Sequence, residues 1–422
     1  MTLRVLPTLF VLLFTLQFVS ACSSTEATLT NKLEPTIILI SIDGARHDYI
    51  DRFNAPNIQS IARSGVRADY LQPVFPSKTF PNHYSLVTGL RPESHGLVNN
   101  NMYDPEYDVV FTMSKREEVE NPRWWGGEPI WVTAEQQGVT AATFFFPGSE
   151  TAVKGVRPSY WFNYDGSISN RTRVEQVLSW LDMPAAERPR IITLYFSDVD
   201  TAGHRFGPNS AEVEASFEAI DAEIGVLLAG LAERGLSDQI NIMITSDHGM
   251  EEVNPRNHFV IDGSFDKALT QQVVYSRETI SIYPLPGQTD VLYQQLSAAI
   301  PAEFGQILRK DSMPERFQYT NHRRIADIIL LANPGNVWAR QRWLEQLTEA
   351  DLNQMIGTHG YDNEHTNMFG IFIAHGPHFK NATQVSGFEM VDVYQVMAKI
   401  LGLTAAANDG NPAVIPMLLE TK

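Results

Sequence analysis

The chain has 422 residues, of which 43% are hydrophobic and 10% aromatic, so it can bury a large core and is not a predominantly disordered protein. Its formal net charge is −17, from 49 acidic and 32 basic residues, which argues against a general nucleic-acid-binding surface. We therefore expect no stable nucleic-acid partner, and a small anionic substrate would need local help such as a metal ion.

The first residues have the pattern of an export signal. Arg4 precedes an apolar stretch over residues 9–19, which is too short to span a bilayer. Residues 19–22, "VSAC", match a bacterial lipobox, so we expect residues 1–21 to be removed and Cys22 to be lipidated as the mature N-terminus. The alternative is an ordinary signal peptide cut after a small residue, with Cys22 incidental.

Cysteine usage favours the lipoprotein, because Cys22 is the only cysteine in the chain. A single cysteine also excludes internal disulfides. We expect export and a lipid anchor in a bacterial membrane, facing the periplasm or the cell surface. Residues 22–34 are small and polar and are interpreted as a tether. A monomeric globular domain is expected over residues 35–422.

Three apolar, β-branched runs, beginning near residues 36, 190 and 240, predict buried parallel strands. Each run is followed by aspartate: Asp43 in "SIDG", Asp200 in "FSDVD" and Asp247 in "TSDHG". Open α/β sheets bind ligands outside the carboxyl ends of their strands. The three strand ends are therefore expected to meet at one site.

Helical patterns lie between these runs, notably over Asn209–Arg234, where Gly235 provides a stop signal. The alternation predicts an α/β fold with a doubly wound, mostly parallel sheet flanked by helices. Residues 264–345 differ, with short apolar runs around one helical segment, and predict a small α+β insertion. The run "GIFIAHGP" at residues 370–377 then returns to the core.

Residue types that bind metals gather at these strand ends and in the loops after them. Asp200 and His204 are four residues apart across what we expect to be a small-residue loop. Asp247 and His248 are adjacent in sequence, before Gly249. A further histidine stands between two glycines, where the backbone can approach a charged centre. Carboxylate and imidazole without thiolate suit Zn²⁺, and also Mn²⁺ or Fe. The set is Asp43, Asp200, His204, Asp247, His248 and His359.

The stretch "PVFPSKTFPNHYSLVTG" at residues 73–89 raises a separate question about Thr79. A threonine just before a helical run is an ordinary helix cap. A threonine beside a metal is also an activated nucleophile. We expect both roles, because the helix N-terminus that wants a cap also offers N–H groups to a phosphate.

Five motifs together resemble the nucleotide pyrophosphatase/phosphodiesterase family of the alkaline phosphatase superfamily, over residues 36–394. They are "ISIDGARHDY", "FPSKTFPNHYSLVTGLRPESHGLVNNNMYD", "DTAGHRFGP", "SDHGM" and "GTHGYDN". The resemblance implies the alkaline-phosphatase-like fold, Thr79 as nucleophile and two Zn²⁺ ions. One ion would be held by Asp43, Asp247 and His248 beside Thr79, and the other by Asp200, His204 and His359.

The resemblance also assigns substrate contacts. Asn100 matches an asparagine that hydrogen-bonds a phosphoryl oxygen, and backbone N–H groups near Thr79 and Phe80 are expected to help. Phe80 and Tyr164 match positions that sandwich a nucleobase, and the alternative for the aromatic residues at 161–164, of which Trp161 is the weaker candidate, is core packing. Relatives commonly have Glu-Pro-Asp where this chain has Asp198-Val199-Asp200. The spacing to His204 favours Asp200 as the ligand.

The other histidines lack a paired carboxylate in a comparable context. We expect most of them to be ordinary polar residues, with His47 and His95 nearest the site and His83 a turn further along the helix that follows Thr79. A neutral Asn100 favours diesters over monoesters, which would need an arginine or a third metal.

The expected activity is therefore hydrolysis of nucleotide phosphodiester or pyrophosphate bonds, releasing nucleoside 5′-monophosphates through a covalent phosphothreonine. One alternative keeps the same metals and acts on choline-type phospholipids, phosphonates or monoesters. Another is a non-catalytic surface-binding lipoprotein, against which the complete set of nucleophile and ligands argues.

Overall fold

The structure, a computed structural model, describes residue 2 and residues 33–420. The predicted export signal, Cys22 and nearly all of the predicted tether lie outside the described residues and stay predictions. Residues from Glu34 onward belong to a single unit. Within the described part of the chain, no helix combines the length and the apolar character that crossing a membrane requires.

The main sheet has eight strands, and most of its pairings are parallel. β18 is antiparallel to both of its neighbours, and the other five pairings are parallel. This confirms the predicted mostly parallel α/β sheet. From edge to edge the strands are β19 (Thr383–Val385), β2 (Val66–Ala68), β18 (Phe372–His375), β9 (Ile240–Thr245), β1 (Thr36–Ile42), β8 (Ile191–Phe196), β6 (Ala141–Phe144) and β7 (Tyr160–Trp161).

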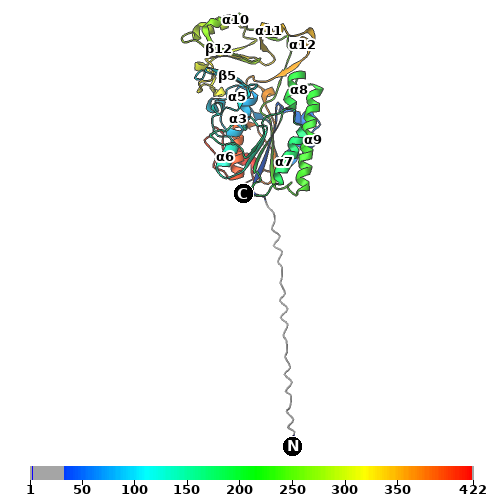
Figure 1. Cartoon of the computed structure of the whole chain (residues 1–422). Coiled ribbons are helices and arrows are strands. Elements are labelled where there is room, and N and C mark those ends of the chain that lie inside the picture. Colours follow the sequence, from blue (N-terminus) through cyan, green and yellow to red (C-terminus); the bar gives the residue numbers. More distant parts are fainter. Residues whose placement is uncertain (1, 3–32, 421–422) are drawn as a thin grey trace. The chain divides into compact units, whose positions relative to one another are not determined.

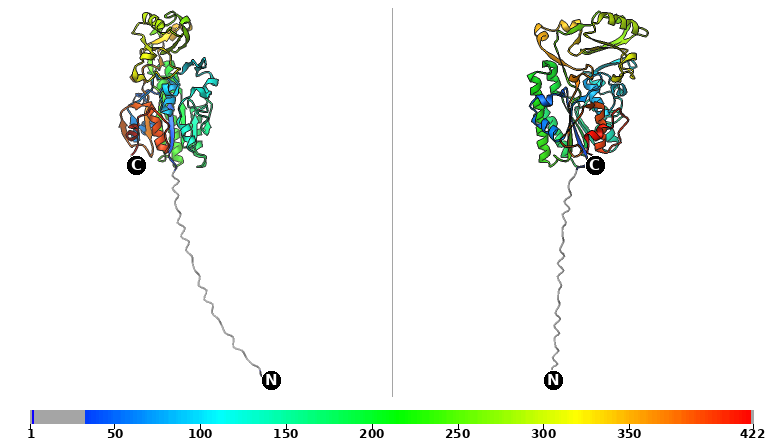
Figure 2. Two further views of the ribbon diagram at one scale, coloured as in Figure 1. Left: turned by 90° about the vertical axis from the view of Figure 1, so that its left-hand side faces the viewer. Right: turned by 180° about the vertical axis from the view of Figure 1, so that it is seen from behind.

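Helices cover both faces of this sheet, which explains why its central strands are apolar throughout. Every residue of β1, β8 and β9 is buried. Figures 1 and 2 show two groups of helices on opposite sides of the sheet. One group is α7 (Asn170–Leu181), α8 (Asp198–Phe206) and α9 (Ala211–Glu233), and the other includes α3 (Thr79–Thr88), α6 (Ile130–Gln136) and α13 (Val393–Leu401).

A second, antiparallel sheet lies beyond one end of this core, at the top of Figure 1. All of its strands fall within residues 264–345, where the sequence changes character. Asn99 Nδ2 donates to Thr279 Oγ1 at 3.1 Å, and Tyr319 O–H donates to the Val98 carbonyl at 2.5 Å, so this sheet is fastened to the core. Its elements are β12 (Thr270–Tyr275), β13 (Thr279–Pro284), β15 (Ile328–Ala332), β14 (Gly305–Arg309) and α10 (Thr289–Ala299).

Shorter elements connect these parts. The helices are α1 (Tyr49–Arg52), α2 (Pro56–Ser64), α4 (Pro92–His95), α5 (Arg116–Val119), α11 (Gln341–Leu344), α12 (Glu349–Asn353) and α14 (Val414–Leu418). The strands are β3 (Leu71–Gln72), β4 (Asn101–Asp104), β5 (Val109–Thr112), β10 (Glu251–Val253), β11 (His258–Val260), β16 (Val337–Ala339), β17 (Ile356–Thr358) and β20 (Phe388–Glu389).

The N-terminus of α2 is capped from another helix. Its own N-cap residue is Ala55, which has no side-chain acceptor. The buried carboxylate of Asp221, in α9, instead accepts from the backbone N–H of Ile58 at 2.7 Å and from the Asn57 side chain at 2.9 Å. Because a negative group at a helix N-terminus is favourable, this contact fixes α2 against α9.

We expect Asp221→Ala to lower the free energy of unfolding by about 2–3 kcal/mol, because it leaves buried donors without an acceptor. Urea denaturation followed by circular dichroism measures this. The matched control is Glu218→Ala on the same helix, which should change stability by less than about 0.5 kcal/mol. Equal effects of the two substitutions would contradict the capping role.

Candidate functional site

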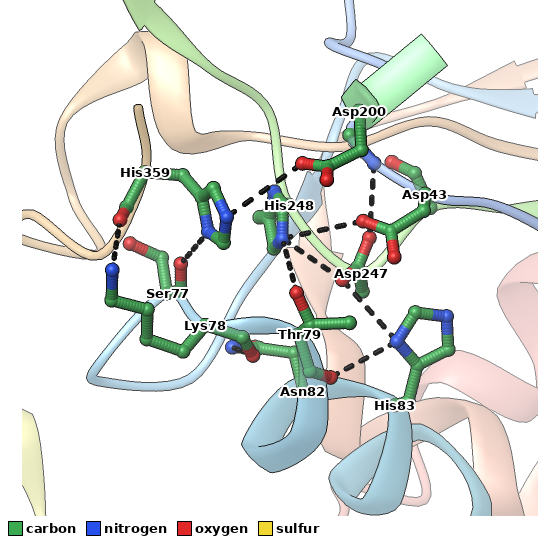
Figure 3. A network of polar contacts seen from close by, with 12 residues as sticks. Asp43, Ser77, Lys78, Thr79, Asn82, His83, Asp200, Asp247, His248 and His359 are labelled. Carbon is green, nitrogen blue, oxygen red and sulfur yellow. Dashed lines mark hydrogen bonds and ion pairs between the residues drawn. The ribbon is translucent and has the colours of Figure 1, made fainter. Parts of the chain in front are cut away.

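Three of the predicted ligands leave the carboxyl ends of adjacent core strands. Asp43 follows β1, and Asp247 and His248 follow β9, which is paired with β1. All three side chains are buried. Figure 3 shows them meeting in front of the N-terminus of α3.

Asp200 and His204 come from a helix, which corrects the loop that we expected. Both lie in α8, which begins directly after β8, and residues four apart share a face of a helix. The glycine that indicated a loop serves close packing, because a Cβ on Gly203 would lie 2.3 Å from Met250 Sδ. Asp198, in the first turn of the same helix, accepts a hydrogen bond from Asn170 at 3.0 Å.

His359 follows β17 and completes the set. The next residue, Gly360, has φ +113°, and a Cβ there would lie 2.2 Å from Lys78 Cε. The glycine is therefore required by both conformation and space. It lets the loop after β17 pass directly over the side chain of Lys78.

The nitrogen and oxygen atoms of these six residues fall into two groups. In the first, His248 Nε2 lies 2.9 Å from Asp247 Oδ2 and 3.5 Å from Asp43 Oδ1. In the second, the separations among Asp200 Oδ1, His204 Nε2 and His359 Nε2 are 3.5, 3.2 and 3.6 Å. Ligands about 2.0–2.1 Å from a tetrahedral ion are about 3.3 Å apart, which these separations suit. The two groups adjoin, because one ligand atom from each of Asp200, His248 and His359 also lies within 4.8 Å of the others.

The three imidazoles are oriented in the same way. His204 Nδ1 donates to the Gly357 carbonyl at 2.9 Å, His248 Nδ1 to the Gly249 carbonyl at 2.8 Å, and His359 Nδ1 to the Ser77 carbonyl at 2.9 Å. A carbonyl only accepts, so each Nδ1 carries the proton and each Nε2 presents a lone pair to the site. This is the arrangement found behind metal-bound histidines.

The aspartates support the same conclusion. Among the described residues, Asp43 Oδ1, Asp200 Oδ1 and Asp247 Oδ2 are buried oxygens without a hydrogen-bond donor. These are the oxygens that lie nearest the imidazole nitrogens. Buried carboxylates without donors are costly unless a cation compensates them, so the residues present fit bound divalent metal.

The pKa shifts have the same physical cause. Burial, with repulsion from Asp247 and Asp200, raises the pKa of Asp43 well above its ordinary value. Burial and the neighbouring His248, Lys78 and His204 lower the pKa of His359 well below its ordinary value. The cluster disfavours anionic Asp43 and favours neutral His359, and a divalent cation would supply the missing positive charge.

Thr79 lies beside the first group but does not cap the helix as we expected. The N-cap residue of α3 is Lys78, and no side chain caps the helix, whose first residue is Thr79. The Thr79 hydroxyl instead lies 3.3 Å from His248 Nε2. The Thr79 hydroxyl is half-buried and makes no capping bond, and it faces the candidate metal ligands rather than the backbone.

Asn100 contacts the same helix N-terminus. Its Oδ1 accepts the backbone N–H of Phe80 at 2.8 Å. That N–H is therefore already bonded, contrary to our expectation that it would hold a phosphoryl oxygen. The same hydrogen bond orients the Asn100 carboxamide, so that Nδ2 is the donor that Asn100 can offer to a substrate.

A cavity of about 310 Å³ opens beside Thr79, and both predicted aromatic residues line it. We call it the apolar cavity because most of its surface is apolar, although Asp43, Asp200, Arg116 and Glu150 also line it. Phe80 forms one part of its wall, and Tyr164, 45% exposed, forms another. Trp161 is absent from the lining and packs against Arg157 instead. The cavity thus has the aromatic walls that a planar group would require.

Comparison with known proteins identifies the family. The model for type I phosphodiesterase/nucleotide pyrophosphatase matches residues 37–362. The chain belongs to this family of hydrolases. It is 36% identical over 398 residues to venom phosphodiesterase CdcPDE of Crotalus durissus collilineatus, covering 91% of this chain and 46% of the relative. It is 35% identical over 401 residues to rat ectonucleotide pyrophosphatase/phosphodiesterase 3, covering 92% of this chain and 44% of the relative.

The chain thus spans less than half the length of these curated relatives. Solved structures of the phosphodiesterase family are similar over most of the chain. Murine ectonucleotide pyrophosphatase/phosphodiesterase 5, an inactive threonine-to-alanine variant in complex with AMP, superposes with a TM-score of 0.83 at 29% identity. That match covers 91% of this chain and 100% of the murine one. The human counterpart gives the same TM-score at 31% identity, covering 91% and 99%. These neighbours confirm the predicted fold.

His83 is a residue of this phosphodiesterase site that the sequence reasoning undervalued. Its Nδ1 lies 3.0 Å from the Thr79 carbonyl and 3.2 Å from Asp247 Oδ2, and its Nε2 lies 2.8 Å from Ser41 Oγ. The i, i+4 spacing from Thr79 was the available signal. His95, expected to lie nearer, instead bonds Ser85 Oγ at 2.9 Å.

A buried ion pair next to Thr79 was also missed. Lys78 Nζ bonds the Glu278 carboxylate, which also accepts from Thr358, and it donates to the His359 carbonyl at 2.6 Å. Burial opposes ionisation of Glu278, but Lys78 and the hydrogen bonds outweigh it and lower the pKa of Glu278. The pair joins α3, the His359 loop and the second sheet.

Glu278→Ala should lower the free energy of unfolding by about 3–5 kcal/mol, because it leaves the Lys78 charge buried and unpaired. Chemical denaturation measures the loss. As a control, replacing both partners in Lys78→Met/Glu278→Leu should recover much of it. Since the pKa of Glu278 is lowered, the pair contributes fully above the ordinary glutamate pKa, and this contribution disappears as the pH falls through the folded-state pKa. A Glu278→Ala loss below about 1 kcal/mol would contradict this account.

Proposed function

We propose that this chain is a zinc-dependent phosphodiesterase/pyrophosphatase that cleaves nucleotide diester or pyrophosphate bonds and releases nucleoside 5′-monophosphates, with Thr79 as the nucleophile. The observation that carries the proposal is the position of the Thr79 hydroxyl, 3.3 Å from His248 Nε2 beside two groups of oriented ligands. Family membership and the AMP complex of the murine neighbour support the same substrate class.

Each group of ligands would hold one Zn²⁺: Asp43, Asp247 and His248 the first, and Asp200, His204 and His359 the second. The two ions would supply positive charge beside the attacking and leaving oxygens of an in-line displacement. Carbonyl contacts hold the imidazoles in the ligand tautomer, and Tyr195 O–H donates to Asp43 Oδ2 at 2.6 Å, which orients that carboxylate.

In the proposed reaction, Thr79 Oγ forms a bond to phosphorus while the bond from phosphorus to the leaving oxygen breaks. The resulting phosphothreonine is then hydrolysed by water, so the two displacements give net retention at phosphorus. Asn100 Nδ2 donates to a non-bridging oxygen, a contribution of a few kcal/mol when such a donor is preorganised.

The charges near Thr79 support a diester rather than a monoester. Asn100 is neutral, and the arginine in the apolar cavity, Arg116, is already bonded to Glu150 at 2.5 Å. Among the described residues that line this cavity, the additional charge of a monoester therefore meets no free cation. The retained nucleoside would place its base between Phe80 and Tyr164, which stack any base and select weakly among bases.

We also propose that the protein is exported and attached to a bacterial membrane through lipidated Cys22, with residues 22–34 as a tether. The basis is the lipobox pattern and the single cysteine. The catalytic proposal does not depend on this attachment, because its residues all lie between Asp43 and His359.

Thr79→Ala should lower kcat for p-nitrophenyl thymidine 5′-monophosphate by about 10⁴-fold or more, because the attacking oxygen is removed. Metal content, measured by mass spectrometry on the purified protein, should stay as in the wild type. Thr79→Ser keeps a hydroxyl and should retain part of the rate. Undiminished turnover by Thr79→Ala would remove Thr79 as the nucleophile.

Chelation should abolish the same reaction, and added zinc should restore it, because the ligand groups have lost their cations. The test compares p-nitrophenyl esters of thymidine 5′-monophosphate, phosphorylcholine and phosphate under the two conditions. The nucleotide ester should be the best of the three substrates. Preference for phosphorylcholine would move the function to lipid head groups, and turnover that survives chelation would contradict the metal requirement.

A further inference from the structure

His83 lies between the nucleophile and the first ligand group, although it is not one of the six proposed ligands. Its imidazole is buried, in α3 one turn after Thr79. Nδ1 lies 3.0 Å from the Thr79 carbonyl oxygen and 3.2 Å from Asp247 Oδ2, and Nε2 lies 2.8 Å from Ser41 Oγ. Figure 3 shows the ring between Asp247 and the start of α3. Both ring nitrogens therefore contact either the proposed site or the strand that leads to Asp43.

These contacts determine which ring nitrogen carries a proton. Both oxygens near Nδ1 are acceptors, one a main-chain carbonyl and the other a carboxylate, so Nδ1 is protonated and Nε2 accepts from the Ser41 hydroxyl. Spacing alone would allow Asp43, His83 and Asp247 to hold one cation. A protonated Nδ1 has no lone pair to give to a metal, so His83 is not a ligand.

The two oxygens of Asp247 are held in different ways. Oδ1 accepts the backbone N–H of Gly44 at 3.2 Å. Oδ2 faces His248 Nε2 at 2.9 Å and lies 3.2 Å from His83 Nδ1, whose hydrogen bond is made to the Thr79 carbonyl. The positive edge of the His83 ring thus attracts Oδ2 and favours one orientation of the carboxylate, as contacts behind a metal ligand do.

The ring of His83 is itself held by its neighbours. Tyr195, whose hydroxyl orients Asp43, lies edge-to-face with His83 at a centroid separation of 5.3 Å. Phe146 makes the same kind of contact at 5.2 Å. Aromatic rings and hydrogen bonds therefore restrict the imidazole together, and in a close-packed interior it has little freedom to turn.

The same imidazole also holds the residue that carries the nucleophile. Thr79 is the first residue of α3, at a helix end without a side-chain cap. The hydrogen bond from His83 to the Thr79 carbonyl ties this residue to the nitrogen that faces Asp247. One N–H group thus relates the main chain of the attacking residue to a proposed ligand of the first ion, and small displacements of reacting groups are costly in rate.

We propose, resting on the function proposed above, that His83 is a positioning residue of the reaction, whose Nδ1–H keeps the Asp247 carboxylate and the Thr79 main chain in one arrangement. In this role His83 touches neither the substrate nor the metal. Without it, the first ion should bind more weakly while the second does not. Turnover should fall through kcat rather than KM, because the lost arrangement matters most in the transition state.

Zinc binding gives a readout that does not depend on turnover. Metal-free protein is titrated with zinc in competition with a chromophoric chelator, and the wild type should bind two equivalents. In His83→Phe, which keeps a ring but no donor, the affinity of one equivalent should fall about tenfold to a hundredfold, while the other binds as in the wild type. His83→Asn retains a side-chain N–H donor and should recover part of the loss.

Kinetics on p-nitrophenyl thymidine 5′-monophosphate at saturating zinc test the effect on the reaction. His83→Phe should lower kcat about a hundredfold with KM within about threefold of the wild type, because a displaced nucleophile slows attack without weakening binding. His83→Asn should recover part of that loss. Ser41→Ala removes only the partner of Nε2 and should lower kcat about threefold to tenfold, the effect of one hydrogen bond.

The matched control is His95→Phe. His95 is also a buried histidine, and its ring bonds Ser85 Oγ at 2.9 Å and the Leu97 N–H at 3.1 Å instead of the proposed ligands. His95→Phe should lower stability in urea denaturation, while kcat and both zinc affinities stay within about twofold of the wild type.

Three results overturn the proposal. Equal weakening of both zinc equivalents in the His83 variants would indicate a general loosening of the fold. Loss of one equivalent beyond detection in His83→Asn would make His83 a ligand. A kcat and zinc affinities within about twofold of the wild type would leave the contact without a role. If neither His83 variant folds, Ser41→Ala decides, and an unchanged kcat there overturns the proposal.

This proposal and the proposed function fail in different ways. A wild-type protein that binds two zinc ions but does not cleave the ester contradicts the activity, whereas the zinc titration still decides whether His83 positions Asp247. A wild-type protein that cleaves the ester, with a kcat and zinc affinities that the His83 substitutions do not change, keeps the activity and removes the positioning role. A wild-type protein that does not bind two zinc ions overturns both.

Discussion

The negative charge of three aspartates, gathered at the carboxyl edge of one sheet, is the constraint on which the rest of the site depends. Asp43, Asp200 and Asp247 each have a buried oxygen without a hydrogen-bond donor among the described residues. Burying carboxylate oxygens in this way costs free energy unless cations compensate their charge. The parallel sheet produces this arrangement, since the pairing of β1 with β8 and β9 brings together Asp43, Asp247 and the start of α8, which carries Asp200. Negative charge that would destabilise an ordinary domain is therefore concentrated at the edge of the sheet where the proposed metal ions would bind.

Backbone contacts fix the orientation of the histidines beside these aspartates. Carbonyl groups of Gly249, Gly357 and Ser77 each accept from one imidazole, so the orientation of the histidines depends on main-chain positions rather than on other side chains. Precision of this kind requires a rigid support, and the Lys78–Glu278 pair provides part of it by joining the nucleophile segment to the second sheet. The second sheet is thus part of the site's support, although it contributes none of the six proposed ligands.

Sequence reasoning located what depends on local pattern and missed what depends on tertiary contact. The strands, the ligand types and Thr79 were visible because apolar runs end in aspartate and because the motifs are dense. The helix carrying Asp200 was mistaken for a loop, since Gly203 meets Met250 only after folding. The roles of Lys78 and Asp221 were equally hidden, because Glu278 and Ile58, their partners, lie 200 and 163 residues away in sequence. Composition gives no warning of such distant pairs.

The two cavities beside the proposed catalytic centre, the apolar cavity and a second, open cavity that His204 and His359 line, differ in their linings. A nucleotide has an apolar, planar end and a polyanionic end, and a site that binds both must place unlike surroundings within a few ångströms of one phosphorus atom. Here Phe80 and Tyr164 come from the core, whereas Ser276 and Glu278, which line the second cavity with Asn100, come from the segment that carries the second sheet. That segment also carries Glu278, which holds Lys78 beside Thr79, so it supports the proposed site as well as lining the second cavity. The proposed ligands and Thr79 therefore lie on elements of the core, whereas part of the wall around them comes from the second sheet's segment.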